Sequence, residues 1–184
     1  MADQTSMQGD EVTPIVPHLA PEFYAWLWYR SDERGGSFDL DGGEDNPVGR
    51  IDLWVDDRLA FRIPGDKKVS AVLTGDNPAE SLEAKAALFG GKVLQEIRVR
   101  IKRDDKEFAV TLKGPEMHLT RMTLPQALSD SEEEAIYDRM FLYDELVFIV
   151  EGLFKAFSAE RLSSEWSTGI VPAMRAWIEG EART

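Results

Sequence analysis

Hydrophobic side chains recur every three or four residues between about residues 132 and 161, the spacing of one face of an α-helix. This stripe consists of Ile136, Met140, Tyr143, Val147, Val150, Phe154 and Phe157. A second apolar row flanks it and consists of Leu142, Leu146, Ile149 and Leu153. Ser131 followed by Glu134 is typical of a capping box. We therefore predict a long helix that is covered from more than one direction, either by the core alone or, at one end, by a second subunit.

Upstream, apolar and polar residues alternate with the period of two that marks β-strands. The first such segments are residues 51–55, 59–63 and 69–73. Because Asp56 and Asp57 separate the first two, we predict a hairpin turn there. Residues 93–102, 108–113 and 118–124 form a second group, in which Met122 and Leu124 are expected on the buried face.

Three shorter helices complete the pattern. One begins near Pro21 and carries aromatic residues around Trp26, which fit a helix docked on the core better than a base-stacking segment. The second is expected to be capped by Asn77 and to end at Gly90. The last would dock on the core through Val171, Met174, Trp177 and Ile178. The predicted fold is α+β, with antiparallel β-meanders, helices packed on one face and a long helix near the C-terminus.

Length and composition fit a single globular domain. We predict a flexible tail over residues 1–17 and one domain over residues 18–184 of the 184-residue chain. Its first twenty residues contain no Lys or Arg and no long apolar run, so a secretory signal is not expected. There are no cysteines, which excludes disulfides and thiolate chemistry and fits a reducing compartment. We expect a cytoplasmic protein without a membrane segment.

The sequence offers no enzyme signature. Its two histidines, His18 and His118, are far apart in the chain and stand outside any metal-binding or Ser-His-Asp spacing. Carboxylate pairs arise by chance in a chain with 30% charged residues, so they identify no acid–base site. We predict a non-enzymatic protein that uses neither a metal nor another cofactor. An enzyme whose site is not visible in the sequence is a weaker third hypothesis.

Positive charge is concentrated in one segment of this acidic chain. Residues 92–124 contain eight Lys/Arg and five Asp/Glu, a net charge of +3 in a chain whose net charge is −13. Arg98, Arg100 and Lys102 leave the same face of their strand because side chains alternate. Lys113 and Arg121 can join that face from neighbouring strands. This is either an ordinary solvated face or a local platform for phosphate groups.

The order of these elements resembles the C-terminal half of the RdgC family of bacterial recombination-associated proteins. The residues that carry the resemblance are GDNPAESLEAKAALFGGKVLQEIRVRIKRDDKEFAVTLKGPEMHLTRMTLP and the helix DRMFLYDELVFIVEGLFKAF, preceded by EFYAWLWYRSDERGGSF. A basic and apolar strand, an acidic turn, a strand like EFAVTL, an L-x-R-x-x-L-P-like strand and a long apolar helix follow in the family's order. The similarity covers roughly residues 19–161.

The resemblance implies sequence-independent binding of double-stranded DNA by a ring-shaped homodimer that restrains a RecA-type recombinase at the nucleoid. Arg98, Arg100, Lys102, Lys113 and Arg121 would be the phosphate contacts, and five such contacts give a log–log salt slope of about −4.5. Reversing Arg98 and Arg100 to Glu is then expected to abolish DNA binding and to leave the fold intact. The alternative is an acidic protein-interaction module that keeps the fold without binding DNA.

Overall fold

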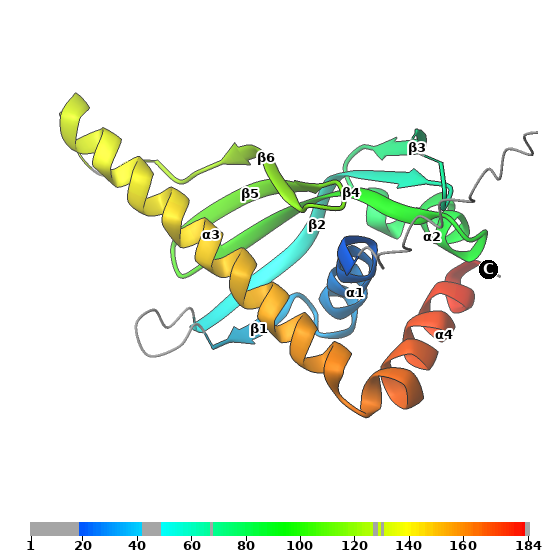
Figure 1. Cartoon of the computed structure of the whole chain (residues 1–184). Coiled ribbons are helices and arrows are strands. Elements are labelled where there is room, and N and C mark those ends of the chain that lie inside the picture. Colours follow the sequence, from blue (N-terminus) through cyan, green and yellow to red (C-terminus); the bar gives the residue numbers. More distant parts are fainter. Residues whose placement is uncertain (1–18, 42–48, 67, 127–128, 130, 183–184) are drawn as a thin grey trace, which may run out of the picture.

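The structure is a computed structural model that describes residues 19–41, 49–66, 68–126, 129 and 131–182. Its centre is a six-stranded antiparallel sheet (Figure 1). The strand order is β1 (Ser37–Leu40), β2 (Gly49–Arg62), β4 (Val93–Arg103), β5 (Lys106–Lys113) and β6 (His118–Thr123), and β3 (Val69–Thr74) pairs with the second half of β2. The predicted α+β fold is confirmed. The predicted tail over residues 1–17 lies outside the described residues.

Helices α1 (Leu19–Glu33) and α3 (Glu132–Leu162) pack on one face of this sheet (Figure 1). The side chains of β4 alternate as predicted, so Ile97, Val99 and Ile101 point toward the helices and are fully buried. The aromatic residues of α1 fill the space between helix and sheet: Phe23, Tyr24, Trp26 and Trp28 are all buried. The sequence around Trp26 is therefore part of the core, and its rings are not exposed for base stacking.

The prediction of a hairpin turn at Asp56 and Asp57 is wrong, because β2 continues through both residues as one strand. The register against β4 explains how. Val55 pairs with Val99 and Leu59 pairs with Ile97, so the three residues between Val55 and Leu59 bulge opposite Arg98 alone. The apolar residues on both sides of the bulge point inward. The sequence therefore shows two alternating segments separated by polar residues, a pattern that fits two strands as well as one bulged strand.

Helix α2 (Leu82–Phe89) begins later than the capping prediction implies. Asn77 makes no side-chain capping bond, and the residues that follow it form the 3₁₀-helix η1 (Pro78–Glu80). The cap of α2 is Ser81, whose hydroxyl accepts a hydrogen bond of 3.1 Å from the backbone N–H of Ala84. At α3 the predicted cap is confirmed, because the Ser131 hydroxyl accepts from the N–H of Glu134.

The C-terminal segment closes one end of the core. Beyond α3, the π-helix η2 (Trp166–Ile170) leads directly into α4 (Val171–Ala182), which packs against α2. Lys85 of α2 is buried in this contact, with its ammonium 4.4 Å from the ring centre of Trp177 and 3.4 Å from a carboxylate oxygen of Asp32. The predicted docking of Met174 is confirmed by its burial.

Burial along α3 differs from the prediction. The row Leu146, Ile149 and Leu153 faces the core, together with Phe157. The predicted stripe is exposed over its first half: Ile136 is 57% exposed and Met140 58%. The cause is geometric, because the start of α3 extends past the strands that would cover it (Figure 1). Within the described residues, no helix combines the length and the apolar character needed to cross a membrane.

Glu160 joins the end of α3 to α1 through a partly buried polar cluster. One of its carboxylate oxygens accepts from the indole N–H of Trp26 at 2.7 Å and from Arg30 at 2.7 and 3.0 Å. Arg34 donates to the other oxygen at 2.9 Å. Burial alone would raise the pKa of Glu160, but the hydrogen bonds from Trp26 and Arg30 and the charges of Arg30 and Arg34 outweigh it, so the pKa lies below the ordinary 4.5.

We expect Glu160→Gln to lower the free energy of unfolding at neutral pH by about 2 kcal/mol, because it removes the charged partner of Arg30. A lowered carboxyl pKa stabilises the fold fully above the ordinary pKa of 4.5 and progressively less as pH falls through the folded-state value. The difference between the two proteins should therefore shrink below pH 4.5, which urea unfolding over a pH series measures. Glu151→Gln, at an exposed position of the same helix, is the control. A difference that stays constant with pH would contradict this role.

Candidate nucleic-acid interface

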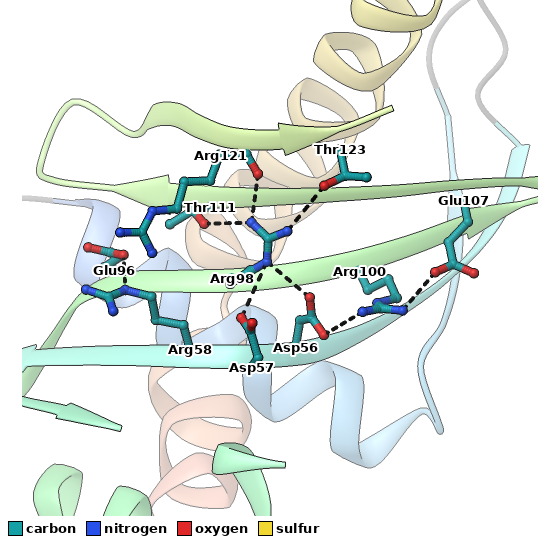
Figure 2. A network of polar contacts seen from close by, with 10 residues as sticks. All are labelled: Asp56, Asp57, Arg58, Glu96, Arg98, Arg100, Glu107, Thr111, Arg121 and Thr123. Carbon is teal, nitrogen blue, oxygen red and sulfur yellow. Dashed lines mark hydrogen bonds and ion pairs between the residues drawn. The ribbon is translucent and has the colours of Figure 1, made fainter. Parts of the chain in front are cut away.

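All five predicted cations come from β4, β5 and β6. Arg98, Arg100 and Lys102 leave β4 on the side away from α1 and α3, as the alternation predicts. We call this side the outer sheet face; in Figure 2 it is viewed with the helices behind the sheet. Lys113 lies opposite Glu96 of β4, and Arg121 follows Thr120, which lies opposite Thr111 of β5. The sequence therefore predicted correctly that Arg98, Arg100 and Lys102 share one face of β4.

Arg98 is held in place by the protein itself. Its side chain is only 15% exposed. The guanidinium donates to Asp56 at 3.1 Å, lies 3.4 Å from a carboxylate oxygen of Asp57, and donates to the Thr111 hydroxyl and the backbone carbonyl of Arg121 (Figure 2). Because each side of its fork already has a partner, Arg98 ties β2, β5 and β6 together and offers little to a phosphate.

A bulge in β6 supplies one of these partners. Arg121 and Met122 lie opposite the single residue Val110, and Arg121 has a φ of 49°, in the left-handed region. The backbone carbonyl of Arg121 accepts from Arg98 at 2.7 Å. Met122 is 39% exposed, so its predicted place on the buried face is wrong. Because of the bulge, the side chains of β6 do not alternate between the two faces of the sheet as the sequence predicts.

Arg100 and Lys113 also form ion pairs with carboxylates, and both side chains are more exposed than that of Arg98. Arg100 donates to Asp56 at 3.1 Å and to Glu107 at 3.0 Å. The negative charge of Asp56, followed by smaller contributions from Glu107, raises the pKa of Arg100 above its ordinary value despite an opposing effect of burial. The Lys113 ammonium lies 3.8 Å from Glu96, which also accepts from Arg58. Carboxylates thus neutralise part of the outer sheet face.

Two of the five cations are not neutralised by a carboxylate of the described residues. The side chains of Lys102 and Arg121 are exposed and form no hydrogen bond or ion pair with the part of the chain that the structure describes. The Lys113 side chain is 56% exposed, and its ion pair is long. Lys102, Lys113 and Arg121 are therefore the residues best placed to contact an external anion.

Sequence reasoning missed the acidic half of this site. The sequence pattern predicts a turn at Asp56 and Asp57, and it contains no sign that these two residues or Glu96 pair with the basic residues. One signal was available: the two aspartates interrupt a long alternation that resumes in phase at Leu59. A bulge within one strand explains such an interruption as well as a hairpin does.

Comparison with protein-family models, with curated proteins and with solved structures finds no match to this chain. Across the described residues, no group of three or more His, Cys, Asp or Glu side chains is arranged to hold a metal ion. The description of the site therefore rests on its geometry alone. It is a basic sheet face on the side opposite α1 and α3, and carboxylates neutralise part of its charge.

Proposed function

We propose that this chain is a non-enzymatic accessory protein of DNA recombination that binds double-stranded DNA without sequence preference, as its resemblance to the RdgC family suggests. The observation that supports this function best is the gathering of five cations on the sheet face opposite the helices. Basic groups on a regular surface contact phosphates, which carry no sequence information. The resemblance further suggests modulation of a RecA-type recombinase, action at the nucleoid and a homo-oligomeric state.

The ion pairs divide the five cations into two groups. Lys102, Lys113 and Arg121 are the proposed phosphate contacts. Arg98 and Arg100 hold the strands and the acidic bulge in place, so binding DNA through them would require breaking existing pairs. Three contacts give a salt slope of about −2.7, smaller than the −4.5 expected from five. The proposed binding is therefore weak and confined to low salt.

The test is fluorescence anisotropy of a labelled duplex over a salt series beginning at about 50 mM. We expect Lys102→Glu combined with Arg121→Glu to abolish binding, because it removes two contacts and adds two repulsive charges. Lys68→Glu combined with Arg175→Glu makes the same change in net charge at two exposed positions away from β4, β5 and β6, one just before β3 and one on α4. This control should bind like the parent. Equal loss in both variants would show that net charge alone, and no particular face, governs binding.

A second function is an acidic protein-interaction module that keeps the fold without binding DNA. It is favoured by the carboxylates Asp56, Asp57, Glu96 and Glu107, which pair with the cations of the outer sheet face and reduce its attraction for phosphate. The net charge of −13 opposes approach to DNA from other directions. Absence of duplex binding at about 50 mM salt would remove the DNA proposal and leave this one.

A further inference from the structure

The exposed first half of α3 carries an unusual amount of apolar surface. Phe141 is 72% exposed, and the other large apolar side chains that remain exposed on this half are Ile136, Tyr137, Met140, Tyr143 and Phe148. Taking about 200 Å² for each large side chain, these exposed fractions amount to roughly 600 Å² on one helix. The largest apolar patch of a monomeric protein is rarely bigger, and patches of this size commonly mark an interaction surface.

The spacing on this surface is that of a coiled-coil seam. Ile136, Met140, Tyr143 and Val147 follow each other at intervals of four, three and four residues, the a/d pattern of a heptad repeat. Further along the helix the same pattern turns into the core, where Phe154 contacts Phe23 and Phe157 contacts Trp26. The second half of the seam therefore has its partner within the chain, and the first half has none among the described residues.

The seam is complementary to itself when two helices run antiparallel. With the two-fold axis between Phe141 and Leu142, Ile136 lies opposite the partner's Val147, and Met140 lies opposite the partner's Tyr143. We call each such pair of facing side chains a layer. Each layer combines two side chains that differ in size, and the two-fold symmetry produces a second copy of it. The side chains that this pairing covers are Ile136, Tyr137, Met140 and Tyr143, and two copies would bury roughly 850 Å² from them, the size of a weak, transient interface.

Charge selects the antiparallel orientation. α3 begins with Glu132, Glu133 and Glu134, and a parallel pair would place these two acidic ends side by side. The antiparallel pair sets them at opposite ends and brings Tyr137, which flanks the seam, next to the partner's Asp144. Because each copy still carries a net charge of −13, repulsion between copies should weaken the pair at low salt.

We propose that two copies of this chain associate through an antiparallel coiled coil formed by the first halves of their α3 helices. The interface is isologous, and its centre is the layer formed by Met140 and the partner's Tyr143. This proposal goes beyond DNA binding and does not depend on it, since α3 lies on the opposite side of the sheet from the outer face. Salt also separates the two activities: it weakens contacts to phosphates but strengthens pairing between acidic copies.

The absence of cysteine from the chain permits a direct test by crosslinking. We expect a mixture of Met140→Cys and Tyr143→Cys proteins to form a mixed disulfide rapidly under mild oxidation with copper–phenanthroline. Each variant alone should crosslink more slowly, because its two thiols lie in different layers. Phe89→Cys, at an apolar position 57% exposed on α2, is the matched control and should stay uncrosslinked. Equal rates in the mixture, the single variants and the control would overturn the proposal.

Sedimentation provides a second readout without oxidation. The parent should form dimers within a range up to roughly 100 µM, and more of them as salt rises. Ile136→Asp combined with Met140→Asp should be a folded monomer, because both residues are exposed in the single chain. Circular dichroism confirms that this variant is folded. A parent protein that stays monomeric over the whole range, or a double variant that still forms dimers, would refute the α3 interface.

Discussion

Replacing Leu153 by aspartate is expected to abolish the cooperative unfolding transition of this protein. Leu153 is fully buried in the row of α3 that faces the core. The change removes a packed side chain, which alone costs about 2–5 kcal/mol, and places a carboxylate where it has no water. Because a domain of this size has a total stability of roughly 5–15 kcal/mol, the folded state should not survive. Thermal denaturation followed by circular dichroism measures the effect.

Phe141→Asp is the matched control on the same helix. Phe141 is 72% exposed and lies outside the coiled-coil seam, so the same aspartate stays hydrated and the fold should persist. The pair of variants tests which face of α3 is buried, a question that hydrophobicity cannot decide because both residues are apolar. Unfolding of both variants, or of neither, would contradict the orientation of the helix in this structure.

Arg98→Glu is expected to lower the free energy of unfolding by about 3–5 kcal/mol, the cost of breaking a largely buried ion pair. The new carboxylate would lie beside Asp56 and Asp57 without the cation that now separates them. The backbone carbonyl of Arg121 would lose its donor as well. Sequence alone suggested the opposite result, an intact fold after reversal of Arg98 and Arg100. Urea denaturation distinguishes the two expectations.

Arg121→Glu makes the same charge change on the same face and serves as the control. Its side chain is exposed and has no ion-pair partner within the described residues, so the stability should change by no more than about 0.5 kcal/mol. Arg98→Lys should fall between the two, since a lysine keeps the charge but cannot reach several acceptors with a planar fork. If Arg98→Glu unfolds at the same urea concentration as the parent, the strands do not depend on this network.

The helices and the inner sheet face could be predicted because their signals are local. Ser131 and Glu134 indicate the start of α3 from four consecutive residues, and the alternation around Val99 gives the two sides of β4 without reference to any other strand. Where a local signal fits two structures, the prediction was wrong. Asn77 and Ser81 are both good caps, and only the path of the backbone after the 3₁₀-helix makes Ser81 the cap of α2.

By itself, the sequence determined that the chain is acidic and free of cysteine, that it forms an α+β fold with a long helix, and that Arg98, Arg100 and Lys102 leave one face of β4. These properties follow from composition and from the period of the side chains. Only the tertiary structure decided which carboxylates pair with those basic residues. The bulge after Val55 brings Asp56 and Asp57 to Arg98, which lies more than forty positions along the chain, and so converts a cationic face into a partly neutralised one. Tertiary structure also decided which apolar row of α3 is buried, because the sheet ends before the helix does, and a periodic pattern contains no information about where its partner stops.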